Sequence, residues 1–260
     1  MDKKELVDRL NDPKYIPGIY NYCDRWCERC QFTSRCLNCE IAEEEFGDFR
    51  EIDLRNKEFW QKFSETLQNN LALLKETAEE EGIDIEAIIA EQTDNDDTGE
   101  ENSVIDLLSH MSMNYAKSVN DWFESNEHLF QEKEDKMNRI RLLATEDNYA
   151  KEAASISDSV EVIGWYQYQI HTKIARACES TSVEESEDKG LPKDSDGSAK
   201  VALIGIDRSI AAWRIFMSSF PEQKKQIAAL INNLENIRKR VEIRFPRARD
   251  FIRPGFDEIK

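Results

Sequence analysis

The chain has 260 residues, which is enough for one large or two small domains. It contains only 9 glycines and 6 prolines, too few for the many tight turns of an all-β fold. Its 53 acidic residues outnumber its 35 basic ones, and the net charge of −18 would repel a nucleic-acid backbone. No stretch approaches the roughly 18 apolar residues of a membrane span, and the first residues lack the apolar segment of a signal peptide. Composition therefore predicts a cytoplasmic, mostly helical protein that binds neither membranes nor nucleic acid.

Apolar residues recur at intervals of three and four along much of the chain, the spacing of amphipathic helices. The predicted helices cover residues 59–78, 104–122, 129–143, 160–177, 199–220 and 227–241. The helix at 199–220 is apolar on nearly all sides up to Arg208, which predicts that it lies at the centre of the fold. Long helices joined by polar connections indicate an all-α protein, an antiparallel helical bundle of four to six helices.

Composition changes along the chain predict three parts. Residues 1–53 form a Cys-rich metal-binding segment, residues 54–245 the helical bundle, and residues 246–260 a basic C-terminal tail. Two acidic stretches near 92–102 and 180–198 are too polar to offset the entropy of ordering them, so we expect mobile loops there.

Five of the six cysteines lie close together in the segment YCDRWCERCQFTSRCLNC. They are Cys23, Cys27, Cys30, Cys36 and Cys39. Disulfides are rare in a reducing cytosol, and two of them would leave one of the five unpaired. The C-x2-C pairs Cys27/Cys30 and Cys36/Cys39 suit a metal, because each short turn can present two sulfurs to one ion. The sequence therefore predicts a metal site made of these cysteines.

The identity of the metal stays open between zinc and an iron–sulfur cluster, because tetrahedral thiolate sulfur suits both. The five residues between the two pairs are fewer than the roughly twelve or more of common zinc fingers, whereas clusters tolerate compact runs. Three arginines within the segment, Arg25, Arg29 and Arg35, are expected to lower the pKa of the thiols and to offset the charge of a tetrathiolate.

Two stretches, IPGIYNYCDRWCERCQFTSRC and GSAKVALIGIDRSIAAW, resemble an uncharacterised bacterial family of helical, cysteine-rich proteins without an established activity. The resemblance implies that Cys23, Cys27, Cys30 and Cys36 are the firm ligands and that Cys39 is spare. It assigns no catalytic residue. The spacing of the first three cysteines is also similar to that of radical S-adenosylmethionine enzymes, but no strand precedes them and no βα pattern follows.

A second, weaker candidate metal site consists of polar residues on the predicted helices. Its members are Asp106, His110, Glu161, Gln167, His171 and Asp207. The paired Glu-x-x-His motifs of dimetal bundles are missing, and a satisfied network of core hydrogen bonds explains the same residues. Two functions stay open: a metal-stabilised interaction or regulatory protein, with a protein partner or a second copy, and a ferritin-like or iron–sulfur redox metalloenzyme.

Overall fold

The structure is a computed structural model that describes residues 3–47, 57–80, 82–83, 101–141, 147–184 and 193–257. Every regular element in these residues is helical, which confirms the all-α part of the predicted fold class. None of the helices in the described ranges is both long and apolar enough to cross a membrane. The chain divides into two compact units, which we call unit 1 and unit 2. Unit 1 contains Met1–Glu101 and Arg253–Lys260, and unit 2 contains Asn102–Ile252.

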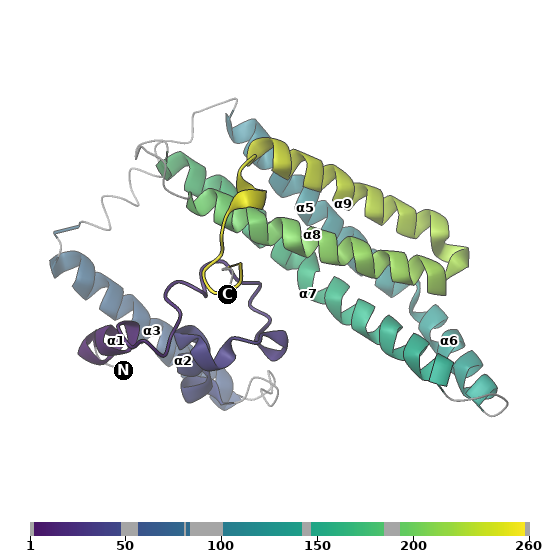
Figure 1. The fold of residues 1–260 in the computed structure, drawn as a ribbon, viewed down its shortest axis with the longest axis horizontal. Helices are drawn as coiled ribbons and strands as arrows, with labels where there is room; N and C mark the ends of the chain where they lie inside the picture. Colours follow the sequence, from purple (N-terminus) through teal and green to yellow (C-terminus); the bar gives the residue numbers. More distant parts are fainter. Residues whose placement is uncertain are drawn as a thin grey trace. The chain divides into compact units, whose positions relative to one another are not determined.

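Unit 1 contains three α-helices and two 3₁₀ turns among its described residues (Figure 1). The helices are α1 (Lys3–Leu10), α2 (Leu37–Phe46) and α3 (Lys57–Glu80), and the turns are η1 (Cys27–Arg29) and η2 (Thr33–Arg35). Residues between α1 and α2 are mostly turns, so this segment depends on side-chain contacts rather than on long helices for its shape.

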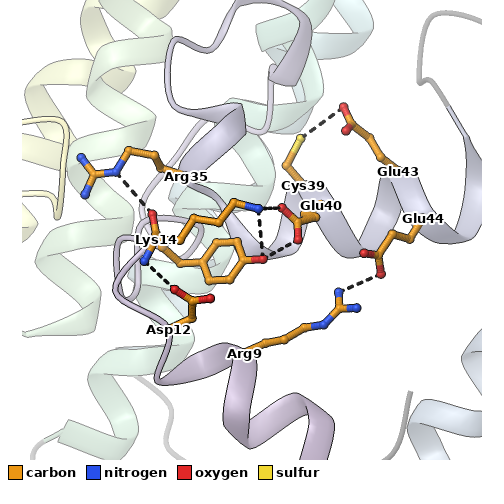
Figure 2. Close-up of polar contacts among 9 residues, drawn as sticks. Arg9, Asp12, Lys14, Arg35, Cys39, Glu40, Glu43 and Glu44 are labelled. Carbon is orange, nitrogen blue, oxygen red and sulfur yellow. Dashed lines mark hydrogen bonds and ion pairs between the residues drawn. The ribbon is translucent and has the colours of Figure 1, made fainter.

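Polar contacts tie the end of α1 and the residues after it to α2 (Figure 2). Arg9 forms an ion pair with Glu44 at 2.7 Å. Glu40 accepts hydrogen bonds from both the Lys14 ammonium and the Tyr15 hydroxyl, and Tyr15 is buried. A single exposed ion pair stabilises a protein by only about 0–1 kcal/mol. These contacts therefore add little stability one by one, and their main effect is to fix the position of α2 relative to the end of α1. These contacts hold the two ends of the Cys-rich segment near each other.

The described residues of unit 2 include five long helices, and α8 packs along both α7 and α9 (Figure 1). The helices are α5 (Glu101–Ser125), α6 (Glu127–Arg141), α7 (Asp147–Glu184), α8 (Asp194–Ser219) and α9 (Lys224–Arg244). Most side chains of α8 are buried, including Leu203, Ile206 and Trp213. The prediction that this helix is central is confirmed, because its apolar residues cover several faces at once.

Aromatic rings fill one end of unit 2. Trp122 of α5 packs edge-on against Trp213 of α8 at 5.1 Å between ring centres, and Phe130 and Phe216 extend the cluster. The indole nitrogen of Trp213 donates a hydrogen bond of 3.0 Å to the Tyr115 hydroxyl. These aromatics therefore form core between α5, α6 and α8 rather than a ligand pocket.

The stretches expected to be mobile loops, near 92–102 and 180–198, lie only partly within the described residues. The loop expected over 180–198 is helical at both of its ends, because α7 continues to Glu184 and α8 begins at Asp194. The Asp194 carboxylate accepts hydrogen bonds of 2.8 Å from Arg176 and from Ser180, and acidic side chains favour the first turn of a helix. Residues 185–192 lie outside the described part of the chain, as do most of 92–102.

The predicted division at residues 53/54 and 245/246 also differs from the structure. The helix α3 belongs to unit 1 rather than to the predicted bundle, and the last residues of the chain divide at Arg253. Residues up to Ile252 belong to unit 2, whereas the segment from Arg253 onward packs in unit 1. The expected C-terminal tail is therefore split between the two units.

The packing of α8 against α7 is tested by a pair of glycine substitutions. A Cβ at Gly205 would lie 2.8 Å from a ring carbon of buried Tyr166, and overpacking of this kind costs roughly 1–3 kcal/mol. Gly164, an exposed α7 residue, has open space at the same position. We expect Gly205→Ala to lower the free energy of unfolding in urea, and Gly164→Ala to raise it by about 0.5–1 kcal/mol. Equal effects of the two substitutions would contradict this packing.

Candidate metal centre

All five clustered cysteines line one small cavity in unit 1, which we call the cysteine cavity. They are Cys23, Cys27, Cys30, Cys36 and Cys39. Its other walls include the apolar side chains of Ile19, Trp26 and Phe256. The cavity volume is about 20 Å³, and a single water molecule needs roughly 10–15 Å³ on the same measure. The space therefore suits one small occupant surrounded by sulfur.

The first C-x2-C pair is positioned by the 3₁₀ turn η1. Side chains three residues apart eclipse each other in a 3₁₀ helix, so Cys27 and Cys30 lie on the same side of the turn. The Cys30 amide donates to the Cys27 carbonyl at 3.1 Å, which closes the turn. Arg25 adopts a left-handed backbone conformation with φ 58°, and this bend lets Cys23 join the same cavity.

The second pair lies at the start of α2. Cys36 precedes the helix, Cys39 is in its first turn, and the amide of Cys39 donates to the carbonyl of Cys36 at 3.1 Å. Cys39 is almost fully buried, with 2% of its surface exposed. The Arg35 carbonyl accepts a 3.0 Å hydrogen bond from the Ile16 amide, which anchors this half of the site to the residues before Cys23.

Burial dominates the electrostatics of the thiols. It raises the pKa of Cys27 to about 11 and that of Cys39 to about 12, and the charges of neighbouring thiolates add to both effects. The pKa of Cys30 is raised by burial in spite of the Phe32 amide, which donates to its sulfur at 3.4 Å. The cavity therefore stabilises protonated thiols as long as no cation is present.

The expectation that nearby arginines lower the thiol pKa values is wrong in its net effect. Arg25 does lower the pKa of Cys36, but burial of the thiol raises it more. The Arg29 guanidinium lies over the Trp26 ring at 4.1 Å, and the side chain of Arg35 donates to the Lys14 carbonyl at 3.4 Å. The arginines therefore frame the segment, and desolvation of the sulfurs outweighs their charge.

Within the described residues, no three His, Cys, Asp or Glu side chains are already arranged as ligands around a metal position. Two thiols instead make the contacts of protonated groups: the Cys23 sulfur donates to the Tyr20 carbonyl at 3.5 Å, and the Cys39 sulfur to the Glu43 carboxylate at 3.9 Å. A thiol that binds a metal loses its proton and with it these hydrogen bonds. Binding an ion thus requires the sulfurs to deprotonate and to turn toward the centre of the cavity.

The second candidate site lies in unit 2, and its residues have varied surroundings. His171 contacts the hydroxyl of buried Ser112 at 3.0 Å, and Asp207 accepts hydrogen bonds from Arg238 at 3.2 Å and from Arg249 at 2.6 Å. His110 and Glu161 are exposed, and Gln167 is partly buried. Asp106 lies on α5, but its side chain is outside the described residues.

The contacts of the second candidate site are typical of a structural role. The partners of His171 and Asp207 are those of satisfied polar groups in and around the core, and the Ser112 hydroxyl donates back to its own helix, which suits structure rather than nucleophilic catalysis. A metal site at these residues stays a prediction.

Sequence reasoning missed Phe256 as a wall of the cysteine cavity. The ring packs edge-on against Phe32, with 5.1 Å between ring centres. In the sequence, Phe256 is indicated only by the turn residues Pro254 and Gly255 before it, within a segment that is otherwise typical of a charged tail.

Comparisons with protein-family models, with curated proteins and with solved structures find no match to this chain. The resemblance of the Cys-rich segment to a bacterial family therefore stays a prediction.

The raised pKa values predict slow reaction of the cavity thiols in metal-free protein. Because only the thiolate reacts, the alkylation rate of Cys27 should rise with pH to a midpoint near 11, compared with 9.0 for an ordinary thiol. Folding raises this pKa, so the folded state binds the Cys27 proton more tightly than the unfolded state does. The contribution of this thiol to the free energy of unfolding is therefore fully present below pH 9.0 and is lost as the pH rises toward 11.

Alkylation with iodoacetamide, followed residue by residue with mass spectrometry, measures this midpoint independently of how fast the reagent enters. The control is the same protein unfolded in urea, in which the Cys27 midpoint should return to that of an ordinary thiol. A native midpoint at or below 9.0 would contradict the dominance of burial.

Proposed function

We propose that this protein binds a metal ion through the thiols of the cysteine cavity and that the bound ion stabilises unit 1. The observation that carries the proposal is the convergence of five cysteines on one cavity. They come from three local structures: the loop at Cys23, the turn η1 and the start of α2. Folding brings thiols together at the cost of raising their pKa, and a cation removes that cost because it stabilises thiolates directly.

The size of the cavity favours a single ion over an iron–sulfur cluster. Its volume of about 20 Å³ accommodates one atom-sized occupant, whereas a cluster brings several iron and sulfide atoms. Zinc is the ion that best fits an all-thiolate, four-coordinate site that has no open position. A cluster would require the walls of the cavity to move apart.

Four sulfurs complete a tetrahedral shell, so one of the five cysteines is spare in this proposal. Cys27 and Cys30 share one face of η1. Burial raises the pKa of the Cys36 thiol, and the Cys39 and Asn38 amides offset part of this rise. Cys23 and Cys39 are the two that donate hydrogen bonds to protein oxygens, and either can supply the fourth ligand. The family resemblance implies Cys23, which leaves Cys39 as the spare.

A structural role fits the composition of unit 1. Few large apolar side chains between its residues 3 and 47 are buried, chiefly Tyr15, Ile19, Trp26 and Leu37, and small cores of this kind need a further constraint. The wider proposal is an antiparallel helical bundle that carries a Cys-rich metal-binding segment and acts as an interaction or regulatory protein in a reducing compartment such as the cytoplasm. A redox metalloenzyme is the alternative, and iron in the purified protein would favour it.

Metal analysis of purified protein tests the proposal. We expect one zinc per chain in a colourless protein, and Cys27→Ser should retain less than about a tenth of that zinc and melt at a lower temperature. The matched control is Cys178→Ala, which removes the buried cysteine of unit 2 and should leave the zinc content unchanged.

Comparison of Cys23→Ser with Cys39→Ser identifies the fourth ligand, since only loss of a true ligand lowers the zinc content. Anaerobic protein that is coloured and contains iron and sulfide would replace zinc with a cluster. A protein that stays free of metal after exposure to zinc and to iron under reducing conditions would refute the proposed function.

A further inference from the structure

The metal site of the preceding proposal is bounded by both ends of the chain. Phe256 lies more than two hundred residues beyond Cys39, yet its ring lines the cysteine cavity together with the five cysteines. It reaches this place because the chain leaves unit 2 after Ile252 and its last residues pack in unit 1. Figure 1 shows this C-terminal segment, in yellow, beside the N-terminal loop in purple.

The segment Arg253–Asp257, which we call the C-terminal strap, has a defined internal structure. The Arg253 guanidinium donates to both oxygens of the Asp257 carboxylate at 2.9 and 3.0 Å, and the backbone amides of Phe256 and Asp257 donate to the Arg253 carbonyl at 3.2 and 3.1 Å. A two-point guanidinium–carboxylate contact fixes orientation as well as distance. The Arg253 guanidinium also lies 4.8 Å from the centre of the Phe256 ring. The strap thus presents the ring in one orientation.

The strap fits closely against the residues that precede the first cysteine. Gly255 has φ +75°, and a Cβ there would lie 3.0 Å from the terminal carbons of both Ile16 and Ile19. Ile19 is buried and is itself a wall of the cavity. Glycine is therefore needed at this position both for its backbone conformation and for the close approach. The ring of the next residue, Phe256, packs edge-on against Phe32.

We propose that the C-terminal strap is a functional part of the metal site, with the Phe256 ring closing the cysteine cavity over the bound ion. This inference rests on the proposed metal-binding function. An apolar wall excludes water, and exclusion of water strengthens the attraction between a cation and thiolates and slows the attack of competing ligands. Phe256 is a positioning residue, since it bonds to no metal. If the docked strap raises the affinity for the ion, thermodynamic linkage requires that the bound ion stabilises the docked strap by the same free energy.

The test compares Phe256→Ala and Gly255→Ala with Ile252→Ala, a substitution at an exposed side chain one residue before the strap. Each protein is loaded with zinc, and the transfer of zinc to a coloured chelator is timed. We expect both strap variants to release zinc faster and to bind it roughly 10–100-fold more weakly, and the control to behave as the wild type. Phe256→Leu, which restores apolar bulk, should recover most of the affinity. Circular dichroism identifies any variant whose helices are lost.

A second readout follows the strap directly and separates it from a general loss of stability. Hydrogen exchange of the Phe256 and Asp257 amides should slow when zinc is added to wild-type protein, and Cys27→Ser should abolish this slowing. If Cys27→Ser loses zinc but Phe256→Ala and Gly255→Ala each bind zinc with wild-type affinity, the role of the strap is overturned and the proposed function stays intact. Wild-type protein that binds no metal would overturn both.

Discussion

Desolvation of sulfur is the constraint on which the structure of unit 1 depends. The chain gathers five thiols around a cavity scarcely larger than a water molecule, and burial then raises the pKa of Cys27 and Cys39 far above the ordinary value. Thiols in such a place pack as small apolar groups while they stay protonated. A cation changes this balance, because it stabilises the thiolate form. Neighbouring thiolates repel each other, but each of them is attracted to the cation. In the proposed function, a bound cation would supply the stabilisation of thiolates that burial alone removes.

The rest of unit 1 serves to bring the cysteines to this cavity. A 3₁₀ turn aligns one pair, a helix start carries the other, and the contacts of Arg9, Lys14 and Tyr15 with α2 hold the two halves together. Unit 2 is organised differently, around the apolar helix α8 and a cluster of aromatic rings. It contains a conventional core, whereas few large apolar side chains are buried in the described loop of unit 1 between α1 and α2, and polar contacts join this part of the chain to α2.

Much of this arrangement is predictable from local sequence. The spacing of the C-x2-C pairs predicts that two sulfurs share a face, and the all-round apolar composition of 199–220 predicts a central helix. Contacts between distant parts of the chain are not predictable in the same way. The place of Phe256 depends on a turn at Gly255 that meets Ile16 and Ile19, and no periodic pattern reports such a contact. The direction of the thiol pKa shifts was also missed, because sequence shows the neighbouring arginines but not the depth of burial.

X-ray absorption at the metal edge of the purified protein tests the central claim most directly, since it counts the atoms bound to the metal without requiring crystals. The account predicts zinc with a shell of four sulfurs at about 2.3 Å and no nitrogen or oxygen ligand. A shell dominated by nitrogen or oxygen atoms would place the metal away from the cysteine cavity and would contradict the account.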